Sequence, residues 1–60
     1  MNAQDNLNLW FPLIVDFAAE YECLMPTGPQ IATFVAEHRY EDFCASGRDD
    51  ALASLFESLA

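Results

Sequence analysis

The side chains best suited to chemistry in this chain are two cysteines and one histidine, Cys23, His38 and Cys44. Thiolate and imidazole groups bind structural zinc, but such sites use paired ligands at short spacing, for example Cys-x-x-Cys. Here the cysteines lie about twenty residues apart with the single histidine between them. We expect His38 at a helix end instead, facing solvent or capping a carbonyl. The spacing therefore predicts no metal and no other cofactor.

A cysteine and a histidine could also act as a nucleophile and its base. Such a pair needs a third group to orient the base and a concave pocket for the substrate. A chain of 60 residues leaves little volume for that pocket. Gly28 and Gly47 are far apart and do not make a phosphate-binding loop. We therefore predict that the chain is not an enzyme.

Charge is the strongest feature of the composition. Ten acidic residues stand against two arginines, Arg39 and Arg48, and the formal net charge is −8 at pH 7. Such a chain repels nucleic acid and anionic membranes and attracts basic surfaces. We therefore predict a positively charged protein partner, with no direct binding to nucleic acid or to a membrane. The alternative is that the charge only keeps a small, apolar-rich protein in solution.

The spacing of the acids makes the partner prediction specific. Asp16 with Glu20, and Glu37 with Glu41, are i,i+4 pairs, which would place two carboxylates on one helix face with Cβ atoms about 5–6 Å apart. That separation is close to the spacing of successive phosphates on a DNA strand. Like-charged i,i+4 pairs destabilise a helix, so a sequence selected only for stability would avoid them. The partner-binding row predicted from this spacing, which Glu22 and Glu57 would flank, is Asp16, Glu20, Glu37, Glu41, Asp42, Asp49 and Asp50.

Two other interpretations of these side chains stay open. The acids can be ordinary solvated helix faces, and Asp49 and Asp50 can cap a helix N-terminus. An exposed aromatic side chain with an acidic rim is also a common interface design. Its candidates are Trp10, Phe11, Tyr40 and Phe43.

The elements that position these side chains are predicted to be helices throughout. No stretch alternates with the period of a strand, so we expect an all-α fold, a compact bundle of three to four short helices in a single domain spanning residues 1–60. Residues 1–6 are polar and are expected to be frayed. A first helix is predicted from about Leu9 to Leu24, capped by Asn8, with Pro12 in its first turn. Its buried stripe is Trp10, Ile14, Phe17, Tyr21 and Leu24.

A turn of prolines and glycine separates the first helix from a second. Thr27 and Gln30 have the spacing of a capping box, which predicts a helix from Gly28 or Pro29 to about His38. This helix should bury Ile31, Phe34 and Val35.

The remaining residues predict one short helix and one longer helix. A short helix after a kink should contain Tyr40 and Phe43 and end near Cys44, with Ser46-Gly47 as its stop. The last helix should begin at Asp49 and Asp50. Its predicted buried stripe is Leu52, Leu55, Phe56 and Leu59.

The compartment is predicted from what the chain lacks. Its N-terminal residues carry no signal-peptide pattern, and the apolar run of residues 9–15 is too short to cross a bilayer. We therefore expect a cytoplasmic protein that acts as a monomer. Cys23 and Cys44 are expected to be buried small apolar side chains, and a disulfide between them stays open.

Taken whole, the chain resembles the small acidic anti-CRISPR proteins of the DNA-mimic kind, in particular those acting on type I-C systems. The features that carry the resemblance are the size, the ratio of acids to bases, and the seven acids of the predicted row. The resemblance implies a phage-encoded inhibitor that works in the bacterial host cell and binds the basic DNA-recognition surface of a CRISPR effector complex, where it blocks entry of the target duplex or reading of the PAM. The alternative is a generic acidic interaction module, antitoxin-like or an adaptor, that binds through an aromatic patch.

Overall fold

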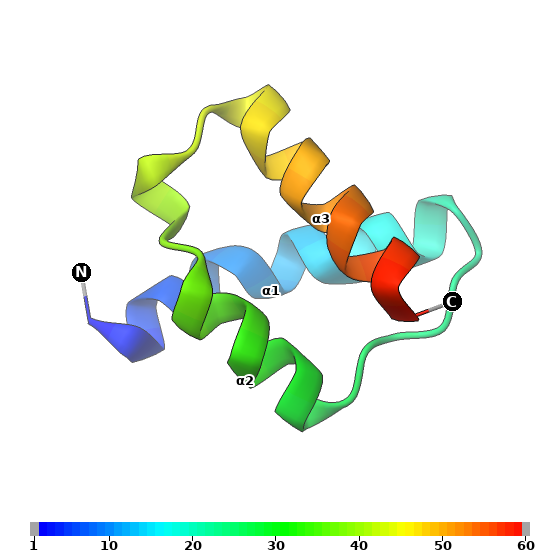
Figure 1. Cartoon of the computed structure of the whole chain (residues 1–60), viewed down its shortest axis with the longest axis horizontal. Helices are drawn as coiled ribbons and strands as arrows, with labels where there is room; N and C mark the ends of the chain where they lie inside the picture. Colours follow the sequence, from blue (N-terminus) through cyan, green and yellow to red (C-terminus); the bar gives the residue numbers. More distant parts are fainter. Residues whose placement is uncertain (1, 60) are drawn as a thin grey trace.

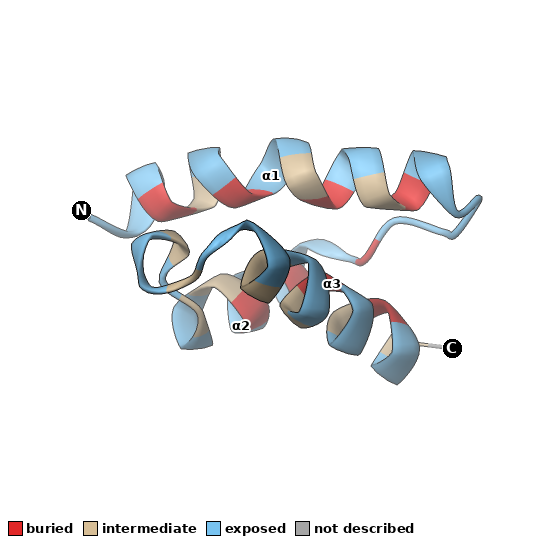
Figure 2. Ribbon diagram, turned by 90° about the horizontal axis from the view of Figure 1, so that it is seen from above, coloured by how far each residue is buried: buried red, intermediate tan, exposed pale blue. Residues whose placement is uncertain are grey.

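Three α-helices in two layers make up most of the chain. The computed structural model describes residues 2–59, which are mostly helical, with no strand among them. The elements, in chain order, are α1 (Ala3–Glu20), α2 (Gly28–Glu37), the 3-10 helix η1 (Tyr40–Asp42) and α3 (Ala45–Leu59). The helix α1 forms one layer, and α2 and α3 together form the other (Figure 1, Figure 2). The all-α prediction is confirmed.

The first helix begins earlier than the sequence predicted. The side chain of Asn2 caps it by accepting a hydrogen bond from the Asp5 N–H at 2.8 Å. The prediction that residues 1–6 are frayed is therefore wrong for residues 2–6, and Met1 lies outside the described residues. Because the helix starts at Ala3, Asn8 is not its cap and Pro12 lies inside the helix rather than in its first turn.

The first helix also ends earlier than predicted. Glu22 has a φ of 53°, the left-handed conformation that closes many helices, and the Cys23 N–H donates to the Ala18 carbonyl at 2.9 Å. The helix therefore ends at Glu20 rather than at Leu24. Leu24 is 92% exposed and Tyr21 is 60% exposed, so neither belongs to the buried stripe.

The second helix matches its prediction closely. Both bonds of the capping box are present, from the Thr27 N–H to Gln30 Oε1 at 2.7 Å and from the Gln30 N–H to Thr27 Oγ1 at 3.4 Å. Ile31 and Phe34 are buried, and the helix ends at Glu37. A short helix is also present where one was predicted, but it is the single turn η1, which ends at Asp42 and does not include Phe43.

The last helix begins at Ala45, before the residues predicted to cap it. Its first intrahelical bond runs from the Arg48 N–H to the Cys44 carbonyl at 2.9 Å. Gly47 therefore lies within α3 and does not act as a stop, and Asp49 lies beyond the first turn. The prediction that Asp49 and Asp50 cap this helix is wrong, because Cys44 occupies the capping position.

The core lies between the two layers, where the buried side of α1 faces α2 and α3 (Figure 2). Trp10 and Ile14 of α1 and Leu52 of α3 are the most deeply buried large side chains. The Trp10 and Phe34 rings meet edge to face with centroids 4.9 Å apart. The whole buried apolar cluster comprises Trp10, Ile14, Ala18, Ile31, Phe34, Leu52 and Phe56. None of the described helices is long and apolar enough to cross a membrane.

Candidate protein-binding surfaces

The seven carboxylates of the predicted row are exposed, but they fall into two groups. Asp16 and Glu20 lie in α1, and we refer to them as the α1 acids. The other five lie between the end of α2 and the second turn of α3, and we refer to Glu37, Glu41, Asp42, Asp49 and Asp50 as the junction acids. In Figure 1 the second half of α1 and the turn η1 lie toward opposite ends of the molecule. The seven side chains therefore do not make a single row.

The α1 acids keep the geometry predicted for them. Asp16 and Glu20 are one helical turn apart on the exposed side of α1, and this helix contains no Lys, Arg or His. The next i,i+4 row of the same exposed side carries Phe11, which is 46% exposed, and Val15, which is 39% exposed. Glu22, also exposed, follows directly after the helix. This surface is negative, uncompensated and bordered by an apolar strip.

The junction acids do not keep their predicted geometry. The backbone leaves the helical conformation at His38, where φ is −128° and ψ is 112°, so Glu37 and Glu41 do not share a helix face. Glu41 forms an ion pair with Arg39 instead. The other arginine, Arg48, stacks over the Tyr40 ring with 3.7 Å between the guanidinium carbon and the ring centroid. Both arginines of the chain therefore lie among the junction acids and offset part of their charge.

Most of the predicted aromatic patch belongs to the core. Trp10 is 0% exposed, and its indole N–H donates to the His38 carbonyl at 3.0 Å. Tyr40 and Phe43 are partly buried, with their rings 5.7 Å and 6.1 Å from that of Trp10. Phe11 is the exposed member of the predicted set.

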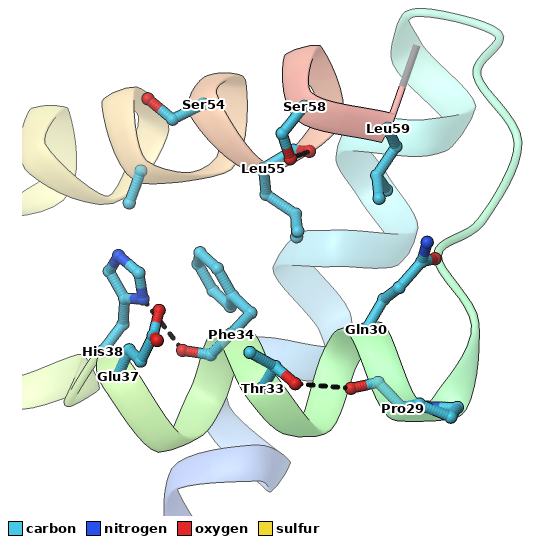
Figure 3. Close-up of a pocket in the computed structure, with 11 residues that line it drawn as sticks. Pro29, Gln30, Thr33, Phe34, Glu37, His38, Ser54, Leu55, Ser58 and Leu59 are labelled. Atoms are coloured by element: carbon cyan, nitrogen blue, oxygen red, sulfur yellow. Dashed lines mark hydrogen bonds between the residues drawn. The ribbon is translucent and has the colours of Figure 1, made fainter.

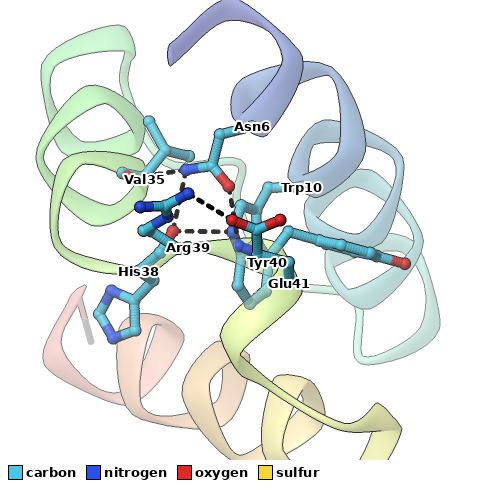
Figure 4. Close-up of polar contacts among 7 residues, drawn as sticks. All are labelled: Asn6, Trp10, Val35, His38, Arg39, Tyr40 and Glu41. Atoms are coloured by element: carbon cyan, nitrogen blue, oxygen red, sulfur yellow. Dashed lines mark hydrogen bonds and ion pairs between the residues drawn. The ribbon is translucent and has the colours of Figure 1, made fainter. Parts of the chain in front are cut away.

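A buried asparagine that the sequence reasoning missed anchors the junction. Asn6 is 7% exposed and uses both ends of its amide (Figure 4). Its Nδ2 donates to the carbonyls of Val35 at 2.8 Å and His38 at 2.9 Å, and its Oδ1 accepts from the Tyr40 N–H at 2.8 Å. Asn6 therefore supplies hydrogen-bond partners to the backbone where the chain passes from α2 to η1. Backbone groups there have no partners within a helix. A signal existed, because Asn6 is in i,i+4 register with Trp10.

A groove separates α2 from α3 at the side of the core. Phe34 and Leu55 face each other across it, with Glu37 and His38 at one end and Leu59 at the other (Figure 3). Its volume is about 450 Å³. The floor is apolar and the rim is polar, which is the pattern of many binding surfaces. The full lining comprises Pro29, Gln30, Thr33, Phe34, Glu37, His38, Ala51, Ser54, Leu55, Ser58 and Leu59.

The cysteines and the histidine do not converge. Cys23 and Cys44 are free and exposed, so the prediction that they are buried is wrong. His38 stacks on Phe34 with ring centroids 4.3 Å apart, and its Nδ1 lies 2.8 Å from the Phe34 carbonyl oxygen. No group of three metal-binding side chains gathers within residues 2–59. Hydrogen bonds from the Ser46 side chain and the Gly47 backbone lower the pKa of the Cys44 thiol.

Comparison with known proteins gave no relative from which a function could be transferred. No protein-family model, curated protein or solved structure significantly matches this chain. The resemblance to anti-CRISPR proteins therefore stays a prediction from the sequence, and the function is argued from the surfaces described above.

Proposed function

We propose that the chain inhibits a bacterial nucleic-acid-binding defence complex, as an anti-CRISPR protein of the DNA-mimic kind, by occupying its positively charged DNA-recognition surface. The observation that carries the proposal is the exposure of the acidic side chains. All ten acidic side chains are exposed, and Glu41 is the one that forms an ion pair among residues 2–59. A small body with a net charge of −8 attracts a basic groove strongly and associates with it fast.

The α1 acids are the contact that we assign to DNA mimicry. Asp16 and Glu20 are held by one helix at a spacing of about 5–6 Å between Cβ atoms, and Glu22 extends the negative surface. No basic side chain of α1 offsets them. We assign the junction acids to long-range attraction only, because both arginines lie among them and offset part of their charge.

The target that we propose is the DNA- or PAM-recognition surface of a type I-C CRISPR effector complex. The chain would act there as a cytoplasmic protein of the bacterial host cell. We take it to be a monomer, because two copies that each carry a net charge of −8 repel one another. We take its helices to form a single domain, a bundle of three to four short helices that presents its charges in a fixed arrangement.

An acidic interaction module, antitoxin-like or an adaptor, is the second candidate function. The observation that favours it is the exposure of Phe11, 46%, in the row next to the α1 acids. An aromatic anchor with an acidic rim would draw its affinity from apolar burial and its orientation from charge. Trp10 cannot serve as this anchor, because it is 0% exposed.

The proposal is tested by competition with DNA. A labelled target duplex is bound to a purified type I-C effector complex, and the chain is titrated in while the bound duplex is measured. We expect displacement, and we expect the affinity of the chain for the complex to fall steeply as salt rises from about 50 to about 200 mM, because the contact is electrostatic. A saturating excess of the chain that leaves the duplex bound would exclude the proposed target.

The Phe11→Ala variant separates the two candidates. Under the mimicry proposal it weakens displacement modestly, whereas reversal of both α1 acids removes it. Under the second candidate, Phe11→Ala abolishes binding to the partner and reversal of the α1 acids leaves most of it. Circular dichroism of each variant controls for folding.

A further inference from the structure

The groove between α2 and α3 has no role in the proposed contact with a DNA-binding surface. Its floor contains Phe34 of α2 and Leu55 of α3, and α1 passes behind the two helices (Figure 3). In Figure 2 the same three helices lie in two layers, with α1 on one side only. The groove is therefore open on the side away from α1.

The dimensions of the groove match a helix. The α2 wall has 10 residues, which corresponds to a length of about 15 Å, or close to three helical turns. A helix of that length can present apolar side chains at i, i+3, i+4 and i+7 to a groove between two other helices. The floor offers apolar contacts along its length, from Ala51 at one end to Leu59 at the other.

The charges around the groove select the kind of helix. Glu37 lies on the α2 rim, exposed, at the end where the backbone carbonyls of that helix are left without helical partners. Asp50 does not line the groove itself, but it is exposed and lies one helical turn before Ser54, which does. Arg48, the nearest cation in α3, is held over the Tyr40 ring. This end of the groove therefore attracts Lys or Arg.

We propose that the groove between α2 and α3 binds a basic amphipathic helix of a partner protein. The apolar stripe of that helix would lie on the partly exposed side chains of Ala51, Leu55 and Leu59, with the buried Phe34 beneath them. Its basic residues would face Glu37 and Asp50. A second copy of this chain fits less well, because its net charge of −8 opposes the approach. The inference goes beyond the proposed function, since the α1 acids do not line the groove.

The test uses a synthetic peptide as the probe and the full chain as the receptor. The peptide is a helix of about ten residues with leucines at i, i+3, i+4 and i+7 and lysines elsewhere. Two control peptides have the same composition in shuffled order and the same pattern with glutamate in place of lysine. Each is titrated into nitrogen-15-labelled protein, and amide shifts are followed by NMR. We expect the basic amphipathic peptide to bind, with the largest shifts at Thr33, Glu37, Ala51 and Ser54.

A matched pair of variants locates the site. Ser54→Lys with Ser58→Lys places two cations on the rim, and both positions are exposed, so the fold should tolerate lysine there. We expect at least about a tenfold loss of peptide affinity, because like charges would face each other across the interface. Ala53→Lys with Glu57→Lys adds at least as much positive charge at exposed α3 positions that do not line the groove, and it should change the affinity by less than about threefold.

Several results would overturn the inference. They are equal binding of the shuffled peptide, an equal loss in the two pairs of variants, no binding of any peptide, or a concentration-dependent dimer with the same amide shifts. Failure here is distinguishable from failure of the proposed function. The Asp16→Lys/Glu20→Lys variant should retain peptide binding while losing DNA displacement, and the Ser54→Lys/Ser58→Lys variant should do the reverse.

Discussion

Two borders of the same core are built in opposite ways. The closed border is the contact between α1 and the α2–η1 connection, and the open border is the groove between α2 and α3. At the first, Asn6 makes three hydrogen bonds to backbone groups, and the Trp10 indole makes another. At the second, Phe34 and Leu55 face each other across an open space of about 450 Å³. The closed border is joined by directional hydrogen bonds, whereas apolar side chains line an open space at the open border.

The difference indicates how a chain of this size fixes its shape. A buried, fully bonded polar side chain specifies one arrangement, because any other arrangement leaves its groups unpaired. Asn6 and Trp10 thus fix the path from α2 to η1, which in turn sets where α3 begins. With that path fixed, the groove does not have to be closed for the helices to hold their positions.

Trp10→Ala should have the largest effect on stability. Trp10 is 0% exposed and contacts rings from α2, η1 and the segment after it, so its removal should cost about 3–5 kcal/mol in the free energy of unfolding. That is comparable to the whole stability expected of a domain this small. Urea denaturation followed by circular dichroism measures it. Phe11→Ala, at the exposed neighbouring position, should cost less than about 1 kcal/mol. Similar midpoints for the two variants would contradict the buried position of Trp10.

Asn6→Ala should have the next largest effect. The substitution leaves the Tyr40 N–H and the Val35 carbonyl without their partner, at a cost of about 1–3 kcal/mol. The matched control is Asn8→Ala in the same helix, because Asn8 is exposed and its side chain accepts a hydrogen bond from the neighbouring exposed Gln4. Asn8→Ala should change stability by less than about 0.5 kcal/mol. Equal effects at the two positions would show that the closed border does not depend on Asn6.

The sequence predicted the elements that rest on local patterns. Thr27 and Gln30 specify the start of α2 through their own side chains, and the apolar spacing of Leu52 and Phe56 specifies the buried side of α3. It also predicted correctly that Asp16 and Glu20 share an exposed helix face.

The sequence predictions fail where tertiary contacts or rare backbone conformations determine the structure. The end of α1 depends on the left-handed backbone conformation of Glu22. Glycine is the usual residue at such a position, and a glycine there would have predicted the end of the helix. The burial of Asn6 in α1 depends on its bonds to Val35 of α2 and Tyr40 of η1, which no local pattern shows. The Glu37–Glu41 pair was predicted from spacing alone, and it is divided by the extended backbone at His38.

Substitutions at the open border should have small effects on stability. Ser54→Lys and Ser58→Lys replace exposed side chains of the groove rim, and each should change the free energy of unfolding by less than about 0.5 kcal/mol. The same denaturation experiment measures this. A loss of more than about 2 kcal/mol from either substitution would show that the rim is part of the packed core and that the two borders are alike.

The smallest expected effect concerns the exposed thiol of Cys44. Cys44 lies at the start of α3, where the Ser46 side chain and the Gly47 backbone lower its pKa, so it should keep a larger thiolate fraction than an ordinary cysteine as the pH falls. Alkylation of Cys44 by iodoacetamide over a series of pH values, followed by mass spectrometry, should therefore proceed at lower pH than in a Ser46→Ala variant, which removes the largest of these effects. The same pH dependence in both proteins would contradict the arrangement at the start of α3.

The central claim is that the position of the α1 acids, and not net charge alone, makes the chain a competitor of DNA. The most direct measurement compares two double reversals, Asp16→Lys/Glu20→Lys and Asp49→Lys/Asp50→Lys, which change the net charge equally, in the displacement of target duplex from a type I-C effector complex. We expect the first to raise the concentration needed for displacement at least about tenfold more than the second, since an ordered contact is lost as well as charge. Equal losses from the two variants would contradict the claim.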